Sequence, residues 1–135
     1  MTAPSIDALA AKIQESLPVF MEQGDVYLLG LFEREDMDGK WDLMISSSRS
    51  DHDPQADIKL FSKKIVKTLT GQELSSLSRM VSVRTTDPAF RALASAMRCE
   101  GGANRIISSN FNGFFIKNAV LFRLVSPSES PTIVT

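Results

Sequence analysis

Residues 25–48 read Asp25-Val-Tyr-Leu-Leu-Gly-Leu-Phe32, then Glu33-Arg-Glu-Asp-Met-Asp-Gly-Lys40, then Trp41-Asp-Leu-Met-Ile-Ser-Ser-Ser48. This pattern predicts two antiparallel strands joined by a charged loop around Asp38-Gly39. The first strand is apolar on both faces apart from Gly30, so it must be covered on both sides and belongs inside a sheet. The second strand places Trp41 on the same face as Leu43 and Ile45. We expect Trp41 to be at least half buried, as the aromatic anchor of this hairpin.

Helices are expected on both sides of this hairpin in the sequence. The apolar spacing over 6–21 predicts an amphipathic helix with a kink or break at Pro18. Asp53-Pro54 and Asp87-Pro88 are typical helix starts, because Asp caps the helix and Pro is tolerated at its first position. The helix after Pro54 is expected to end at Gly71, with one further turn over 72–77, and the helix after Pro88 to end at Gly101-Gly102. A third strand is predicted over 79–85.

Asn112-Gly113 indicates a second hairpin, with strands over 104–111 and 114–125, because both turn residues must adopt positive φ. One face of its last strand is expected to carry Phe114, Ile116, Val120, Phe122 and Leu124. The helices that follow the second and third strands can act as crossovers, which gives some parallel pairing. The predicted fold is a single α+β domain over residues 1–125, in the order α-β-β-α-β-α-β-β. It has a mixed sheet of about five strands, three helices and a flexible tail over 126–135.

The composition is that of an ordinary soluble domain. The 135 residues are 43% hydrophobic and 23% charged, and the net charge of −1 exerts no overall attraction for nucleic acid or an anionic membrane. A single cysteine excludes an intrachain disulfide. No signal peptide is apparent, and no apolar run approaches the roughly 20 residues of a membrane-spanning helix. These features predict a cytoplasmic protein.

Metal sites of the common kinds do not fit this sequence. If Asp36 were the first ligand of a calcium loop, glycine would fall at the fourth position instead of the sixth, and Ser47 would stand where the bidentate glutamate belongs. One histidine and one cysteine are too few for a zinc cluster. The arginines of the second half lack interleaved aromatic residues, so nucleic-acid binding is unsupported. No metal and no cofactor is predicted.

Candidate site residues are scattered around the strand ends. The catalytic candidates are Asp42, Ser46 and His52, and the ligand-binding candidates are Glu33 and Arg34. His52 lies between two aspartates, which fits either a general base or an exposed loop histidine. Ser46 opens a run of three serines but lacks the surroundings of a serine nucleophile, since no Gly-x-Ser-x-Gly motif is present.

Residues 6–98 resemble, in a degenerate form, the minimal nucleotidyltransferase domain. Leu28-Leu29-Gly30-Leu31-Phe32 is similar to the first strand of that family, and Trp41-Asp42-Leu43-Met44-Ile45 to the second. Leu31 stands where the family has serine, Lys40 stands where it has its first aspartate, and residues 79–85 contain no carboxylate. Because two metal ions cannot be held by Asp42 alone, the resemblance implies the fold of that family without its two-metal chemistry.

Two functions of different classes follow. The first is a non-enzymatic domain that binds another protein or a second copy of itself; the alternative is a nucleotide-binding or nucleotidyltransferase-like protein with a degenerate site. For the first, we expect a homodimer formed through the last strand, because residues 122–125 extend beyond their hairpin partner. Residues 1–75 carry 8 Lys/Arg and 13 Asp/Glu, and residues 76–135 carry 7 and 3, so such a dimer is expected to weaken with salt.

Overall fold

The computed structural model describes residues 6–111 and 113–127. The elements are α1 (Ile6–Met21), β1 (Val26–Glu33), β2 (Trp41–Ser47), α2 (Gln55–Lys64), the 3₁₀ turn η1 (Val66–Thr68), α3 (Gly71–Ser76), β3 (Leu77–Ser82), α4 (Pro88–Ala96), β4 (Asn104–Phe111) and β5 (Phe114–Leu124). The predicted α+β class and the interspersed order of helices and strands are confirmed. The six-residue helix α3 stands where one further turn was expected, and it makes four α-helices within the described residues.

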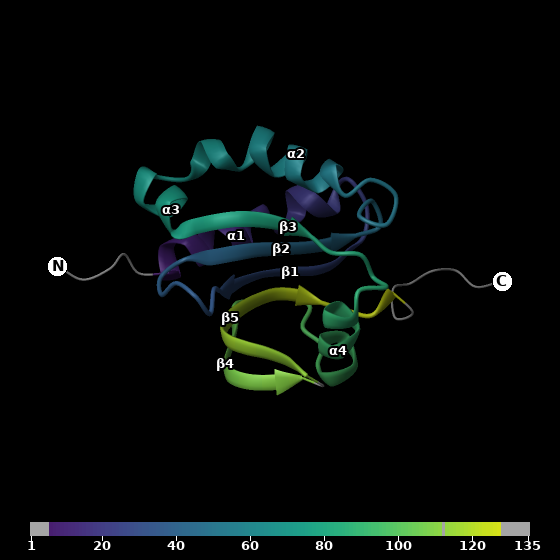
Figure 1. The fold of residues 1–135 in the computed structure, drawn as a ribbon. Helices are drawn as coiled ribbons and strands as arrows, with labels where there is room; N and C mark the ends of the chain where they lie inside the picture. Colours follow the sequence, from purple (N-terminus) through teal and green to yellow (C-terminus); the bar gives the residue numbers. More distant parts are fainter. Residues whose placement is uncertain (1–5, 112, 128–135) are drawn as a thin grey trace.

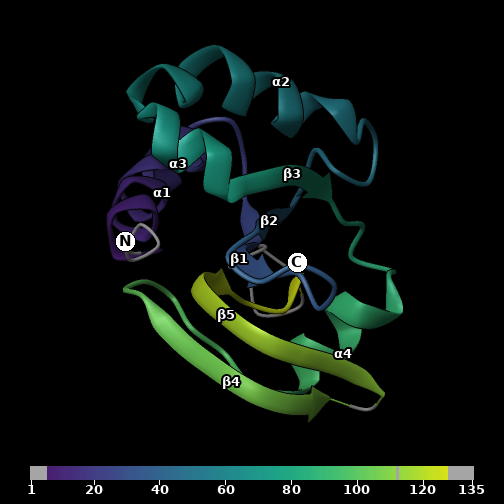
Figure 2. The same ribbon diagram turned by 60° about the vertical axis from the view of Figure 1, so that its left-hand side comes forward.

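The five strands form one mixed sheet in the order β3-β2-β1-β5-β4. β1 is its central strand and pairs antiparallel with β2 and with β5, while β2 and β3 are parallel. Figures 1 and 2 show α1 and α2 on one side of the sheet and α4 on the other, next to the curled β4–β5 hairpin. The predicted position of the first hairpin at the centre of the fold is therefore confirmed.

Each face of β1 contributes to its own hydrophobic core. Leu29 and Leu31 belong to the core under α1 and α2, while Leu28 and Phe32 belong to the core under α4. Alternate residues of a strand point to opposite faces, so one uniformly apolar strand supplies both cores. Trp41 is only 4% exposed and lies in the first core with Leu43 and Ile45, as predicted.

Glycine at position 30 allows β5 to approach β1 closely. A Cβ atom there would lie 2.7 Å from Leu121 Cδ2 and 3.2 Å from the Val120 carbonyl oxygen. The β1–β5 register also shifts between Leu29 and Gly30. Gly30, which interrupts the apolar run of β1, is thus needed because β5 leaves no room for a side chain at this position.

The burial of Trp41 has a direct spectroscopic consequence. We expect the native protein to emit at clearly shorter wavelength than free indole and to shift to the red on unfolding, because the indole leaves an apolar core for water. Chemical denaturation followed by tryptophan fluorescence tests this at a single site, since Trp41 is the only tryptophan. Native emission at the wavelength of free indole would contradict the burial.

α1 spans the predicted residues, Ile6–Met21, and runs through Pro18 without a break, whereas one helix boundary on the same side of the sheet differs from the prediction. Gly71, expected to end the preceding helix, instead begins α3, because the Thr70 side chain accepts a hydrogen bond from the Glu73 backbone and the Glu73 carboxylate accepts one from the Thr70 backbone. This reciprocal cap defines a new helix start that outweighs the helix-ending tendency of glycine.

The elements around α4 also end earlier than predicted. β3 ends at Ser82 instead of residue 85, and α4 ends at Ala96, before the glycines at 101 and 102. Met97 is extended, and the Cys99 backbone exchanges two hydrogen bonds with Leu124, of 2.9 and 2.7 Å. Pairing with the end of β5 therefore takes these residues out of the helix.

The predicted common face of β5 is wrong. Val120 and Phe122 point to the core under α1, whereas Ile116 and Leu124 point to the core under α4. The register shift between β1 and β5, at Leu29 and Gly30, skips residue 122 of β5, and Ser108 of β4, with φ 45°, is left out of the β4–β5 pairing. A shift of one residue exchanges the two faces of a strand. Asn112 and most of the predicted tail (128–135) lie outside the described residues.

The predicted unpaired end of the last strand is also wrong. β5 lies inside the sheet, where Leu28 pairs with Leu124 and the Val125 N–H donates to the Tyr27 carbonyl at 2.9 Å. The edge strands are β3 and β4. α2 packs at the outer side of β3 (Figures 1 and 2), and the positive φ of Ser108 interrupts β4. Covering helices and irregular edges both hinder pairing with another sheet. The homodimer itself stays a prediction, to be tested by light scattering at low and high salt.

Within the described ranges, none of the helices has the length and apolar character that crossing a lipid bilayer requires.

Candidate functional site

A groove of about 300 Å³ lies on the α4 side of the sheet. It is formed where β1 ends and β2 begins, with the middle of β3 on one side and the start of β5 on the other. Its apolar lining consists of Phe32, Met44, Val81, Phe114, Phe115 and Ile116. Its charged lining consists of Glu33, Arg34, Glu35, Asp42, Arg79 and Lys117.

The loop between β1 and β2 is folded tightly and brings its charges to the rim of the groove. The Arg34 N–H donates to the Lys40 carbonyl at 2.8 Å, and Gly39, with φ 76°, closes the turn. The Gly39 N–H donates to Glu33 Oε2 at 2.8 Å. Glycine suits this position because residues with a Cβ rarely adopt such a φ.

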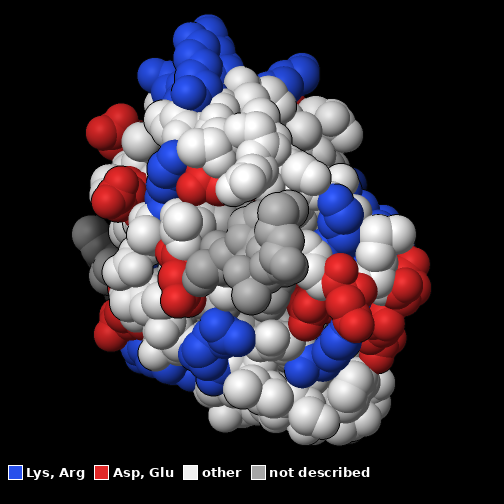
Figure 3. All heavy atoms as spheres, turned by 90° about the vertical axis from the view of Figure 1, so that its left-hand side faces the viewer, with Lys and Arg blue, Asp and Glu red and all other residues white. Residues whose placement is uncertain are grey.

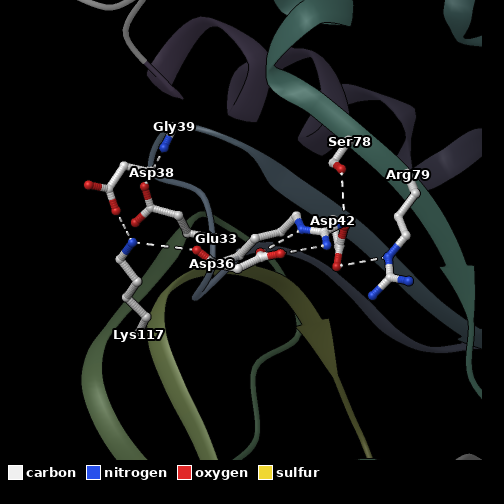
Figure 4. A network of polar contacts seen from close by, with 9 residues as sticks. Glu33, Asp36, Asp38, Gly39, Asp42, Ser78, Arg79 and Lys117 are labelled. Atoms are coloured by element: carbon white, nitrogen blue, oxygen red, sulfur yellow. Dashed lines mark hydrogen bonds and ion pairs between the residues drawn. The ribbon is translucent and has the colours of Figure 1, made fainter.

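Arg34 is held between a carboxylate and a hydroxyl at this rim. Its Nε and Nη2 atoms donate to the two oxygens of Asp36 at 2.9 and 3.0 Å, and its Nη1 donates to Ser78 Oγ at 3.2 Å. Figure 4 shows these contacts beside the loop between β1 and β2. The hydrogen bonds from Arg34 lower the pKa of the Asp36 carboxyl, and the same pair raises the pKa of Arg34.

Asp42 pairs with Arg79 across the two parallel strands. Arg79 Nε lies 3.1 Å from Asp42 Oδ2, and the Arg79 side chain is 60% exposed against 13% for Asp42 (Figure 4). The parallel register of β2 and β3 places the two residues directly opposite each other. Asp42 Oδ1 is buried and has no hydrogen-bond partner among the described residues.

Lys117 of β5 pairs with Asp38 of the β1–β2 loop. Its ammonium group also lies 3.4 Å from the Arg34 carbonyl oxygen. The hydrogen bond from Lys117 lowers the pKa of Asp38, and the bond to Asp38 raises the pKa of Lys117. Each of the three cations at the groove therefore already has a carboxylate partner.

The Arg34–Asp36 pair predicts a specific titration behaviour. We expect the Asp36 carboxyl to titrate below its ordinary pKa of 3.8 in the native protein, and to return toward 3.8 in Arg34→Gln. Since the pKa is lowered on folding, this pair stabilises the protein above pH 3.8 and loses its effect as the pH falls through the native pKa of Asp36. Carboxyl carbon NMR measures both values. Asp38 is the internal control, because its partner Lys117 is unchanged, and an Asp36 pKa that is insensitive to the variant would contradict the assignment.

The structure brings together three of the five residues proposed from sequence. Glu33, Arg34 and Asp42 all line the groove. Ser46 lies toward the other end of β2 and is buried, and its Oγ has no hydrogen-bond partner in the described part of the chain. His52 is exposed in the loop after β2, and its backbone N–H donates to the Arg49 carbonyl at 3.0 Å. Of the three catalytic candidates, Asp42 lines the groove, and Ser46 and His52 do not.

Arg79, Lys117 and the phenylalanines at 114 and 115 were missed as groove residues. The sequence did contain a signal for Arg79. The predicted crossover from the second to the third strand implies parallel pairing, and this pairing places a residue of the third strand next to Asp42. No local pattern marks Lys117, which lies 79 residues from Asp38.

The described residues offer few groups suited to metal binding or to nucleophilic catalysis. Among residues 6–111 and 113–127, no group of three or more His, Cys, Asp and Glu side chains is placed to hold a metal ion. Burial raises the pKa of the Cys99 thiol, which favours its unreactive protonated form.

A second polar cluster is centred on Asp57, whose side chain is fully buried and whose two carboxylate oxygens both accept hydrogen bonds. Asp57 Oδ1 accepts from Arg49 at 2.6 and 3.0 Å, and Oδ2 accepts from Ser47 Oγ at 2.7 Å and from Ser50 Oγ at 3.0 Å. This cluster joins the loop after β2 to the first turn of α2. Because both Asp57 oxygens have protein partners, we interpret it as structural.

Comparison of this chain with protein-family models, with curated proteins and with solved structures yields no match. The fold and the groove define a single α+β domain with a charged-rimmed apolar groove. The resemblance to the nucleotidyltransferase domain stays untested.

Proposed function

We propose that this protein is a non-enzymatic domain that acts by binding another protein, and that the groove holds a short apolar segment of that partner. The observation that carries the proposal is an apolar groove whose three rim cations, Arg34, Arg79 and Lys117, already have carboxylate partners. A partner that offers an apolar side chain gains from the lining without having to compete for the paired ions.

Phe115 is the natural anchor for such a segment. It is 43% exposed at the edge of the groove, whereas Phe32 and Ile116 in the lining are buried. Exposed aromatic side chains beside a buried apolar surface are typical of the residues that contribute most to protein–protein binding. The pairs Arg34–Asp36, Asp42–Arg79 and Lys117–Asp38 then form a polar rim around this centre.

The same pairing argues against a nucleotide in the groove. A phosphate group needs free cations or a concave array of backbone N–H groups. Here a bound phosphate would have to displace Asp36, Asp42 or Asp38 from its cation. The neighbour of Asp42 is moreover Arg79, whereas a two-metal site would need a second carboxylate beside Asp42.

Selection from a displayed random-peptide library tests the proposal with a defined probe. The wild-type protein is used for selection, and the enriched peptides are then measured against Phe115→Asp and against Ile107→Asp. Ile107 is a matched control, since it is an apolar residue 66% exposed on β4 and outside the groove lining. We expect binding to weaken by about tenfold or more in Phe115→Asp and to change by less than about twofold in Ile107→Asp. Failure to enrich any peptide, or equal binding by both variants, would contradict the proposal.

A thermal-shift series with nucleotides and Mg²⁺ tests the alternative function. We expect no reproducible stabilisation of the wild-type protein by ATP or GTP with Mg²⁺. Stabilisation that is lost in Asp42→Asn would support the nucleotide-binding alternative and overturn the present proposal.

A further inference from the structure

α2 and η1 carry a row of three lysines, Lys59, Lys63 and Lys67, here called the lysine ridge. All three side chains are exposed. Lys59 and Lys63 lie one helical turn apart, about 6 Å along the helix axis, and Lys67 follows four residues later on η1. Figure 3 shows Lys and Arg atoms gathered at the top of the molecule, where Figure 1 places α2.

The ridge lysines differ from Lys12, Lys40 and Lys117, each of which has a partner within the protein. Lys12 pairs with Glu73, Lys117 pairs with Asp38, and Lys40 donates to the Ser75 carbonyl. Within the described part of the chain, the ridge lysines form no ion pair and no side-chain hydrogen bond. Residues 58–72 contain no Asp or Glu at all. Lys64 is left out of the ridge because it lies on the α1 side, where it shares a hollow with Glu15.

The surroundings of the lysine ridge indicate which kind of anionic partner it can bind. The apolar side of α2 is already buried in the core through Phe61 and Ile65, so it is not free to insert into a lipid bilayer. The ridge is composed of lysines, which act as point charges toward phosphate and lack the planar fork with which arginine matches a carboxylate. Its only aromatic neighbour on α2, Phe61, is buried, so the surface offers no ring on which unpaired bases can stack.

We propose that the lysine ridge binds the sugar-phosphate backbone of a nucleic-acid duplex without reading its sequence. A duplex has one negative charge per about 1.7 Å of its axis, so a short row of flexible cations can meet several phosphates at once. The protein as a whole has a net charge of −1, so the attraction is local and is expected to be strongest at low salt. This interaction does not depend on the groove.

Fluorescence anisotropy with a labelled DNA duplex of arbitrary sequence, about 20 base pairs long, tests the proposal between about 20 and 200 mM KCl. We expect the logarithm of the affinity to fall with the logarithm of the salt concentration with a slope near −3, as for about three phosphate contacts. Each single Lys→Gln change in the ridge should reduce that slope by about one, and the triple variant should abolish binding. The ridge side chains are exposed, so thermal denaturation of the triple variant should match the wild type.

The control is a variant with the same change in net charge on the other part of the surface: Arg84→Gln, Arg91→Gln and Arg105→Gln, all exposed positions. It should keep the wild-type affinity and slope. No binding at the lowest salt, equal losses in both triple variants, or binding to phosphatidylserine vesicles but not to the duplex would overturn the proposal.

Discussion

Replacing Asp57 with alanine is expected to lower the free energy of unfolding by about 3–5 kcal/mol, which is the cost of removing one member of a buried ion pair. The Asp57 side chain is fully buried, and that of its partner Arg49 is 19% exposed. The substitution leaves the Arg49 guanidinium and the hydroxyls of Ser47 and Ser50 without their shared acceptor. Urea denaturation followed by the fluorescence of Trp41 measures the change.

Asp53 provides the matched control for this experiment. It is an exposed aspartate at the start of the same helix, and its Oδ1 accepts from the Gln55 N–H at 3.1 Å. Pro54 stands at the N-cap of α2 and no side chain caps the helix, contrary to the predicted Asp cap, so Asp53→Ala should cost only about 1 kcal/mol, as for the loss of one exposed hydrogen bond. If Asp57→Ala costs no more than Asp53→Ala, the buried cluster does not stabilise the fold as described.

A double variant separates the energetic contribution of the ion pair from the cost of burying one charge without its partner. Arg49→Leu with Asp57→Leu removes both charges, so it leaves neither buried without its partner. We expect it to be less destabilised than the sum of the two single variants, because removing one partner alone has a cost that removing both avoids. Strict additivity would show that the two residues do not act as a pair.

Truncating Phe122 to alanine should have an effect of similar size, about 3–5 kcal/mol, through a cavity in the core. Phe122 is completely buried on β5 and packs in the core between the sheet and the helices α1 and α2. The lost stabilisation has two parts: the free energy of transferring the ring from water to the core, and the van der Waals contacts that the residues around the cavity lose.

Phe115→Ala is the matched control in the same strand. Phe115 is 43% exposed, so its truncation should change the free energy of unfolding by about 0.5 kcal/mol or less. The two phenylalanines thus separate stability from the proposed binding function, since the first is expected to affect folding and the second to affect only the groove. A Phe122→Ala protein as stable as the wild type would show that β5 does not pack as described.

The groove and the lysine ridge are opposite kinds of surface. In the groove, the three cations are paired within the protein and the apolar lining is available to a partner. On the ridge, the charges are unpaired within the described residues, and the apolar side of the helix is already buried. Peptide binding and duplex binding are therefore expected to respond to different substitutions, and the failure of one proposal leaves the other standing.

The amino-acid sequence by itself determined the elements whose signals are local. The doubly apolar strand from Val26 to Phe32 required cover on both faces, which placed it at the centre of the sheet. The alternation after Lys40 buried Trp41, and the Asp-Pro pairs located the starts of α2 and α4 to within a residue or two. These features follow from hydrophobic periodicity and from the fixed φ of proline, neither of which depends on distant parts of the chain.

Only the tertiary structure decided the features that depend on register and on distant partners. Val120 and Phe122 of β5 face the core under α1 while Ile116 and Leu124 face the core under α4, so the common face predicted from strict alternation does not exist. Its end is covered by β1 and by Cys99, which removed the basis for pairing through that end. The groove likewise depends on Arg79 and Lys117, whose carboxylate partners lie far away in the sequence. A shift of one residue in register reverses which side chains face the core, and such shifts are set by packing between segments that no local pattern connects.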